Sequence, residues 1–381
     1  MKEELGIYIH IPFCKQKCYY CDFVSFAPKT YLQEEQETAY MEKLIQEIKM
    51  SKEILQKYNV TTVYIGGGTP SFVDSEYIGK ILKELDGNIS REAEVTIELN
   101  PGTVNKEKLR DYRIAGINRL SIGLQTAKKD LLEQIGRIHT YEQFEETYKM
   151  AREVGFENIN VDLMIGLPNQ RIQAVKDTVD LVTALEPSHI SVYSLILEEG
   201  TKLYEMIERR EIELPDENRE REMYWYVKNR LELAGYNHYE ISNYSKKGKE
   251  SKHNLNCWNQ EQYVGFGVAS HSYLDGKRYS NTDDIHEYIN IELTSLDKIR
   301  KTHENQDLEK KQKEYMLLGL RKIEGVVVSE FKRKFGENPI YLFRNELEDL
   351  IEEDLVEIDL DNIILTNKGI NFANLVWEKF V

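Results

Sequence analysis

The stretch Gly6 to Phe23, GIYIHIPFCKQKCYYCDF, decides how the rest of the chain is interpreted. It begins with alternating apolar and polar residues and ends in three cysteines, Cys14, Cys18 and Cys21, spaced C-x3-C-x2-C. In a reducing compartment, clustered cysteines are more often metal ligands or catalytic thiols than disulfides. An iron–sulfur cluster normally takes four ligands, so three thiolates would leave one iron open to a non-protein ligand. The alternatives are a zinc knuckle completed by a distant ligand and three unrelated buried thiols.

Length and composition limit the class of protein. The chain has 381 residues and a net charge of −16, and its length suits one large domain and one small domain. The acidic balance argues against non-specific binding to nucleic acid or to anionic membranes. No apolar run approaches the ~20 residues that span a bilayer, and no signal or transit peptide precedes the first strand. We therefore expect a cytoplasmic protein with no nucleic-acid partner and no membrane span.

Strands and helices alternate along the first 200 residues. Apolar residues at helical spacing predict helices, and short β-branched or alternating runs predict strands. The predicted strands cover residues 6–12, 61–65, 94–99, 119–122, 160–164 and 189–193, and the first predicted helix covers 37–58. Six βα units are too few for a closed eight-stranded barrel. The sequence therefore predicts an α/β fold, a partial (β/α)6 TIM-type barrel with its chemistry at the carboxyl ends of the strands.

The βα rhythm ends near residue 294. Residues 297–313 are charge-rich and predict a linker running into a helix, and the predicted helices 313–322, 329–335 and 340–353 precede a hairpin at 356–366. This order resembles a winged helix, but residues 307–381 carry 11 Lys and Arg against 16 Asp and Glu, whereas a DNA-binding domain should be basic. We predict a barrel with its extension over residues 1–293. A winged-helix-like domain over 294–381 would cover the open barrel or contact a partner protein.

The cysteine stretch resembles the signature of the radical S-adenosylmethionine (SAM) superfamily. Its flanks, IYIHIPFC and CYYCDF, resemble the HemN-like coproporphyrinogen dehydrogenase branch, which includes the HemW-like heme chaperones, and similar motifs continue over residues 6–275. The resemblance implies a 4Fe-4S cluster on Cys14, Cys18 and Cys21, with SAM chelating the open iron. It also implies a partial (β/α)6 barrel core and an electron donor such as flavodoxin or ferredoxin.

Further motifs fall at predicted strand ends. Glycines in the GGGTP stretch at 66–70 let the backbone approach a ligand and pair with it through N–H groups; a turn without a ligand is the alternative. Glu98 alternates with apolar Ile97 and Leu99, so its side chain points to the other face of the barrel wall. A carboxylate there can accept hydrogen bonds from ribose hydroxyls. The alternative is a carboxylate that is only solvated. By resemblance, the SAM site comprises Tyr8, Gly67, Gly68, Thr69, Glu98, Gln125, Arg137 and Asp162.

The stretch HNLNCW, His253–Trp258, resembles the HNxxYW motif associated with heme binding, but Cys257 stands where tyrosine is expected. His253 can offer an imidazole to heme iron, and Cys257 can offer a thiolate. Alternatively, His253 and Asn254 only brace the barrel mouth, and Cys257 behaves as a small buried hydrophobe. His271 is a second candidate heme ligand.

Three functions remain open. The first is a heme chaperone that binds a 4Fe-4S cluster, SAM and heme and transfers heme to an acceptor protein. The second is an oxygen-independent coproporphyrinogen III dehydrogenase acting through a 5′-deoxyadenosyl radical; the third is a non-catalytic switch that controls a partner. Asp22-Phe23 stands where the dehydrogenase pattern has a fourth cysteine, and only residues 1–5 precede the first strand, where the dehydrogenase carries an extension. Both features favour the first function, so we assign no catalytic residue.

Overall fold

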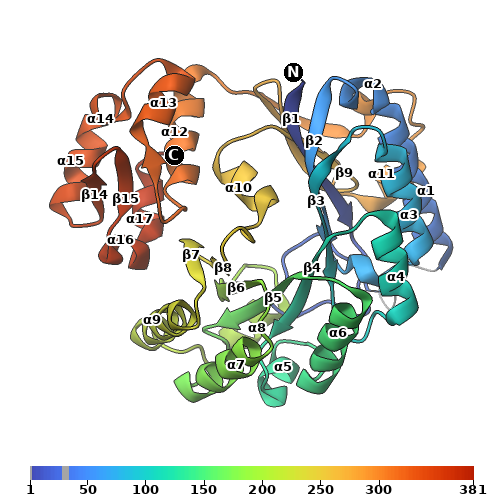
Figure 1. Cartoon of the computed structure of the whole chain (residues 1–381), viewed down its shortest axis with the longest axis horizontal. Helices are drawn as coiled ribbons and strands as arrows, with labels where there is room; N and C mark the ends of the chain where they lie inside the picture. The colour runs from blue at the N-terminus through green and yellow to red at the C-terminus, as the bar shows by residue number, and fades with distance from the viewer. Residues whose placement is uncertain (1, 28–33) are drawn as a thin grey trace.

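The computed structural model describes residues 2–27 and 34–381. Its centre is a twelve-stranded sheet in the order β12-β11-β10-β9-β1-β2-β3-β4-β5-β6-β8-β7. Six parallel strands form the middle in chain order: β1 (Glu3–Ile11), β2 (Tyr58–Gly67), β3 (Ile89–Leu99), β4 (Arg119–Gln125), β5 (Asn158–Ile165) and β6 (His189–Ser194). Figure 1 shows them curving into an open arc with helices along its outer side. The predicted partial (β/α)6 barrel is confirmed.

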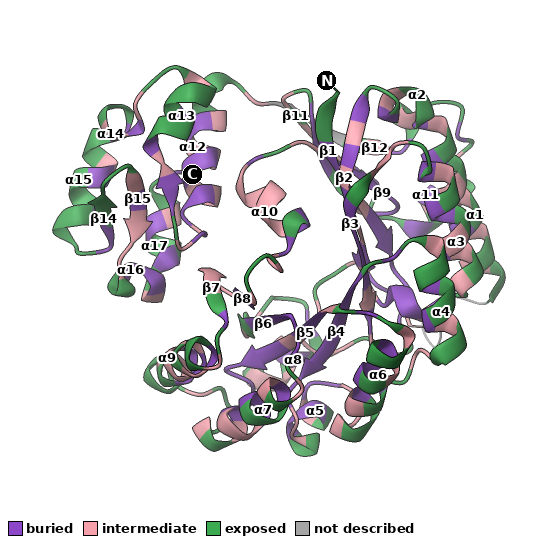
Figure 2. Cartoon of the chain, in the orientation of Figure 1, coloured by how far each residue is buried: buried purple, intermediate pink, exposed green. Residues whose placement is uncertain are grey.

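Alternation along each strand separates the outer core from the inside of the arc. Ile7, Ile9 and Ile11 of β1 are fully buried in the outer core, whereas Tyr8 and His10 lie on the opposite face. Figure 2 shows the strands buried and the outer helices exposed on their solvent side. The outer helices are α1 (Glu34–Met50), α2 (Lys52–Leu55), α3 (Ser75–Leu85), α4 (Lys106–Ala115), α5 (Lys129–Gln134), α6 (Tyr141–Val154), α7 (Ile172–Ala184), α8 (Lys202–Glu208) and α9 (Glu217–Leu233).

The first helix is shorter than its apolar period predicts. The prediction of one helix over 37–58 is wrong, because α1 ends at Met50, α2 is a single turn and Tyr58 already belongs to β2. Ser51 Oγ donates to the Glu47 carbonyl at 3.0 Å, a bond that commonly bends helices. Tyr58 is then drawn into the sheet, where it pairs with Glu3 of β1.

Further strands extend the sheet at both edges. On one side lie β9 (Tyr263–Phe266), parallel to β1, and then β10 (His271–Leu274), β11 (Lys277–Asn281) and β12 (Arg300–Asn305); on the other lie β8 (Asn243–Ser245) and β7 (Asn237–Glu240). The linker predicted at 297–313 is wrong in part, since β12 pairs antiparallel with β11. An edge strand has one neighbour and tolerates charged residues. The domain division at 293/294 stays a prediction.

The last part of the chain has a core of its own, which includes Met316, Phe331, Phe343 and Ile363. A small sheet in the order β13-β15-β14 packs with short helices, and the predicted winged-helix-like arrangement is confirmed. Its elements are α12 (Leu308–Gly319), β13 (Val326–Val327), α13 (Val328–Phe335), α14 (Pro339–Leu342), α15 (Arg344–Glu352), β14 (Val356–Asp359), β15 (Asn362–Leu365), α16 (Asn367–Asn371) and α17 (Ala373–Glu378).

One short helix, α10 (Lys252–Trp258), lies inside the arc and faces the C-terminal domain (Figure 1). The guanidinium of Arg321 lies over the rings of Trp258, at 4.4 Å, and of Trp377, at 4.7 Å. Lys322 Nζ donates to Asn259 Oδ1 at 2.8 Å, just after the helix. Cation–π contacts and hydrogen bonds thus tie α10 to the C-terminal domain. Separately, within the described ranges, no helix combines the length and apolar character needed to cross a membrane.

Candidate cofactor-binding site

The cysteine loop folds back against β1 directly after that strand ends. The Cys14 N–H donates to the Phe26 carbonyl at 2.9 Å, and the Phe26 N–H donates to the Pro12 carbonyl at 2.7 Å. Cys14 is buried, and Cys18 and Cys21 are half-buried; all three are free thiols. The Thr69 hydroxyl donates to Cys14 Sγ at 3.5 Å. The structure therefore places Thr69 against the first predicted cluster ligand.

Gly68 explains why the loop after β2 is glycine-rich. A Cβ at this position would lie 2.9 Å from Cys14 Sγ and 2.8 Å from the Pro12 carbonyl carbon, closer than a side chain tolerates. The Gly68 N–H donates to the Ile11 carbonyl at 2.9 Å, so the two loops touch along their backbones. The absence of a side chain lets the GGGTP loop border the cysteines.

The three thiols fit an iron–sulfur cluster by their donor chemistry. Among the residues that the structure describes, no three His, Cys, Asp or Glu side chains form a group that could hold a single metal ion. An iron–sulfur cluster does not need such a group, because it distributes its thiolate ligands over separate irons. Burial raises the pKa of the Cys14 thiol to about 11 and also raises that of Cys21. Both thiols are therefore protonated near neutral pH, and cluster binding would displace their protons.

Glu98 lies inside the arc at the end of β3 and is held by two donors from β2. The Tyr64 hydroxyl donates to its Oε1 at 2.9 Å, and the Gly67 N–H donates to its Oε2 at 3.2 Å. A carboxylate has about four lone-pair positions, so each oxygen can accept a further bond from a ligand. Burial first, and then the neighbouring carboxylate of Asp162, raises the pKa of Glu98 to about 7.

Tyr8 and Gly67 meet around His10. His10 Nε2–H donates to the Val24 carbonyl at 2.9 Å, and Nδ1 is hydrogen-bonded to the Tyr8 hydroxyl at 2.9 Å. Burial lowers the pKa of His10, which favours the neutral ring in which Nδ1 accepts from Tyr8. Gly67 has φ +115°, and a Cβ there would lie 2.7 Å from the His10 ring.

We expect Gly67→Ala to lower the free energy of unfolding by about 1–3 kcal/mol, the usual penalty for a strained backbone conformation. The added Cβ also presses on His10. The midpoint of urea unfolding checks this change. Gly79→Ala is the matched control, because Gly79 lies in α3 with open space around its Cβ position, and alanine should be neutral or stabilising there. Equal midpoints for Gly67→Ala and wild type would contradict the expectation.

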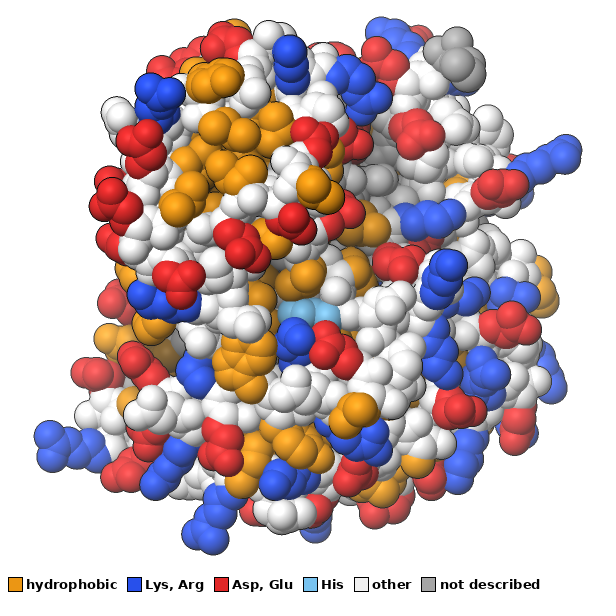
Figure 3. All heavy atoms as spheres, turned by 60° about the vertical axis from the view of Figure 1, so that its left-hand side comes forward, with side chains coloured by type: hydrophobic (Ala, Val, Ile, Leu, Met, Phe, Trp, Pro, Cys, Tyr) orange, Lys and Arg blue, Asp and Glu red, His pale blue; other side chains and the backbone are white. Residues whose placement is uncertain are grey.

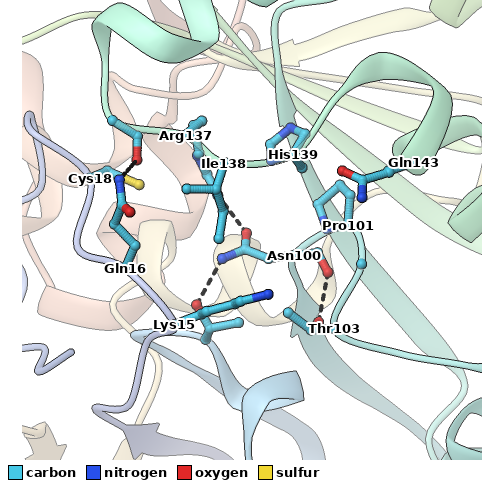
Figure 4. A pocket seen from close by; sticks show the side chains of 13 residues that line it. Lys15, Gln16, Cys18, Asn100, Pro101, Thr103, Arg137, Ile138, His139 and Gln143 are labelled. Atoms are coloured by element: carbon cyan, nitrogen blue, oxygen red, sulfur yellow. Dashed lines mark hydrogen bonds between the residues drawn. The ribbon is translucent and has the colours of Figure 1, made fainter. Parts of the chain in front are cut away.

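Asn100 and Arg137 border a solvent-open pocket that Cys18 also lines. Arg137 Nη1 donates to Asn100 Oδ1 at 2.6 Å (Figure 4). Asn100 Nδ2 in turn donates to Thr69 Oγ1 at 2.7 Å. Arg137 Nη2 reaches the Tyr20 hydroxyl at 3.3 Å. Its Nε is buried and has no hydrogen-bond partner among the described residues. A guanidinium with a spare donor beside the cysteines fits a ligand carboxylate.

Gln125 and Asp162 complete the inner wall on the next two strands. Gln125 ends β4 with φ 69°, and both its Nε2 and Arg137 Nη2 lie about 3 Å from the Cβ position of Gly123. Asp162 accepts hydrogen bonds from Ser121 Oγ at 2.9 Å and from Asn160 Nδ2 at 2.8 Å. Burial raises the pKa of Asp162. The predicted SAM residues therefore come together along the carboxyl half of the arc.

The two predicted heme residues lie on α10, nearer the amino ends of the strands. His253 is 7% exposed; its Nδ1 is hydrogen-bonded to Thr62 Oγ1 at 2.9 Å, and its backbone N–H donates to Glu94 Oε1 at 3.2 Å. Burial, together with Arg119, lowers the pKa of His253 to about 4. Burial raises the pKa of Cys257 to about 11, with Arg278 opposing. His271 is exposed at the start of β10.

Several side chains at this site were not predicted from the sequence: Tyr64, His10, Asn100 and Tyr20. Tyr64 carried a usable signal, because it alternates with buried Val63 and Ile65 and therefore faces the same side as Glu98 does on β3. Asn100 had none, since its contacts with Thr69 and Arg137 join three separate loops.

Comparison with known proteins identifies both parts of the chain. Residues 8–182 match the Radical SAM superfamily, and residues 306–372 match the HemN C-terminal domain. The chain is 38% identical to the heme chaperone HemW of Bacillus subtilis over 98% of both chains. It is also 38% identical to the heme chaperone HemW of Lactococcus lactis, covering 100% of this chain and 98% of that one.

Among solved structures, the chain resembles the coproporphyrinogen III oxidase HemN from Escherichia coli, a radical SAM enzyme. The TM-score is 0.84, and the match covers 100% of this chain and 90% of that chain. Sequence identity is 22%, so this likeness establishes the shared fold and leaves the activity open.

Proposed function

This chain belongs to the HemW family of the radical SAM superfamily, and from that premise we propose that it is a heme chaperone. In this proposal it binds a 4Fe-4S cluster, SAM and heme, and transfers heme to an acceptor protein in the cytoplasm. The observation that carries the proposal is the joint presence of a strand-end site around the cysteines and the HNLNCW helix packed inside the arc. An electron donor such as flavodoxin or ferredoxin would reduce the cluster.

Cys14, Cys18 and Cys21 would hold the cluster, which when bound offers one open iron to SAM. The GGGTP backbone would hold the amino group of SAM, and Arg137 has a free Nε for its carboxylate. Glu98 retains lone pairs for ribose hydroxyls, and Tyr8, Gln125 and Asp162 would complete the SAM site. These donors and acceptors are what makes SAM fit the site. Most of them already have one protein partner and can still form a further hydrogen bond.

His253 is the preferred heme ligand, and Cys257 is the second choice. With a pKa of about 4, the imidazole is neutral at physiological pH and has a lone pair for iron. The Cys257 thiol, with a pKa of about 11, is protonated at the same pH and must lose its proton before it binds. Heme ligation by His253 also requires the ring to leave its buried position.

The C-terminal domain offers a surface for an acceptor protein. Exposed apolar side chains occur across it, including Tyr341 at 72% and Leu360 at 97% exposure, and Figure 3 shows apolar side chains gathered on the face turned toward the viewer. Contiguous exposed apolar area is typical of protein interfaces. The same domain contacts α10 through Arg321 and Lys322, so the acceptor would meet the part of the chain that carries the heme residues.

A heme titration followed by the Soret band tests the proposal. We expect wild type and Cys257→Ala to give the shifted band of ligated heme, and His253→Ala to lose it, because neutral imidazole is a common heme ligand. A shift that is lost only in Cys257→Ala would assign the thiolate as ligand instead. Absence of heme binding by the wild type would contradict the chaperone function.

The dehydrogenase alternative is tested in the same preparation. With SAM, a reductant and coproporphyrinogen III, the proposal predicts that no decarboxylated porphyrinogen forms. Formation of harderoporphyrinogen or protoporphyrinogen IX would reassign the chain to the dehydrogenase. Release of 5′-deoxyadenosine without added porphyrinogen would separate a SAM-cleaving enzyme from a switch that only binds SAM.

A further inference from the structure

Three aromatic rings connect α10 with the residues assigned to SAM. The Tyr64 ring stacks on His253 with centroids 5.2 Å apart and planes 28° apart. The same ring also stacks on Tyr8, at 6.4 Å and 23°. Tyr8 and Tyr64 are register partners on β1 and β2, so the sheet itself fixes this second contact.

Tyr64 also fixes the orientation of Glu98. Its hydroxyl donates to Glu98 Oε1, while the Gly67 N–H holds Oε2. The position of the Tyr64 ring therefore determines where a carboxylate oxygen points. Because the Tyr64 ring stacks on both His253 and Tyr8, a displacement of His253 removes one of the two ring contacts that keep the Tyr64 hydroxyl on Glu98.

His253 cannot reach a porphyrin from where it lies. It is 7% exposed, its Nδ1 is occupied by Thr62, and its backbone N–H is held by Glu94. Axial ligation uses an in-plane lone pair at the edge of the imidazole, and at 7% exposure the His253 ring must move from this position before a porphyrin can approach that edge. Because the ring stacks on Tyr64 in this position, the movement changes the contact between His253 and Tyr64.

We propose that Tyr64 is a positioning residue that couples the two sites, so that heme ligation through His253 weakens SAM binding at Glu98. By thermodynamic reciprocity, bound SAM weakens heme binding by the same factor. SAM loading then favours release of heme to the acceptor. The inference rests on the proposed heme and SAM functions and adds the coupling between them.

The test is calorimetric titration of SAM into the full, cluster-loaded chain under anaerobic conditions, with and without saturating heme. For wild type we expect SAM to bind about tenfold more weakly when heme is present, a coupling of about 1.4 kcal/mol. Tyr64→Phe keeps the ring and removes the donor to Glu98. We expect this variant to bind SAM more weakly than wild type in the absence of heme. The heme effect, which is the ratio of SAM affinities without and with heme, should fall to less than about twofold, because the ring no longer donates a hydrogen bond to Glu98.

Tyr112→Phe is the matched control, since the Tyr112 hydroxyl is fully buried on α4 and has no hydrogen-bond partner in the described ranges. It should retain wild-type SAM binding and the full heme effect. A variant that only loosens the fold would weaken SAM binding equally with and without heme, so the ratio of the two affinities reports coupling specifically.

The titration separates failure of this inference from failure of the proposed function. If the Soret shift depends on His253 and SAM affinity is the same with and without heme, the coupling is wrong and the chaperone function stands. Retention of the full heme effect in Tyr64→Phe would also overturn the role of Tyr64. If wild type binds no heme, both proposals fall; if it binds heme without His253, the coupling is wrong and the chaperone function stands with another ligand. The reciprocal titration of heme with saturating SAM must give the same factor.

Discussion

Protein carrying Cys14→Ala, purified and reconstituted under anaerobic conditions, is expected to lose its brown iron–sulfur absorbance. The loop supplies three thiolates, and its ligand count is already one below the usual four. Removing one leaves two, so a cubane cluster would have two irons without protein ligands. Cys18→Ala and Cys21→Ala are expected to behave alike. Bound iron and acid-labile sulfide, measured per chain, should fall to near zero.

Cys257→Ala is the matched control for the cluster. Cys257 lies on α10, outside the loop, and its protonated thiol lies near Arg278. Its loss should leave cluster content at the wild-type level. An intact cluster in the triple variant of the loop would contradict the assignment, and equal loss of cluster in Cys257→Ala would point to a fourth protein ligand.

The second large effect is expected at Glu98. Glu98→Ala should weaken SAM binding about 10–100-fold while the cluster still assembles, because a hydrogen bond to a charged acceptor contributes about 1.5–3 kcal/mol. Glu98→Gln keeps an acceptor oxygen for Tyr64 and should fall between wild type and alanine. Calorimetry with cluster-loaded protein measures the affinities. Unchanged SAM binding in Glu98→Ala would place the ribose elsewhere.

The affinity for SAM is also expected to depend on pH through Glu98. The carboxyl group has a raised pKa of about 7, so it is largely protonated at pH 6 and largely ionised at pH 8. Ribose hydroxyls donate more strongly to the ionised form, so affinity should rise with pH across this window, by at most about tenfold per unit below pH 7. Glu98→Gln should flatten the profile. An equally steep profile in Glu98→Gln would assign the dependence to another group.

Folding stability should change in the opposite direction over the same range. A carboxyl group whose pKa is raised from 4.5 to about 7 on folding favours the folded state below pH 4.5, and this contribution is lost as pH rises through 7. Facing groups are the Asp162 carboxylate, which raises this pKa, and Tyr64, Gly67 and Arg137, which oppose it. SAM binding is therefore expected to favour the ionised form of Glu98, whereas folding favours its protonated form.

The sequence was sufficient where a property depends on neighbours along the chain. The alternation of Ile7, Tyr8 and Ile9 predicted which side of β1 faces the arc, and the C-x3-C-x2-C spacing predicted one loop with three thiols. It was insufficient near Ser51, where α1 ends and only the single turn of α2 follows before the chain enters β2. It also failed at residues 300–305, where pairing with β11 turns a predicted linker into a strand.

Local periodicity and residue spacing thus determined the partial barrel, the winged-helix-like domain, the cysteine loop and the face on which Glu98 lies. Only the tertiary structure decided that Asn100 joins Thr69 to Arg137, and that Tyr64 stacks with both His253 and Tyr8 while its hydroxyl binds Glu98. The physical reason is the separation along the chain between the residues that interact. Secondary structure follows from interactions within a few residues, whereas these contacts join residues 31 to 189 positions apart, and only the folded sheet brings them within hydrogen-bonding or stacking distance.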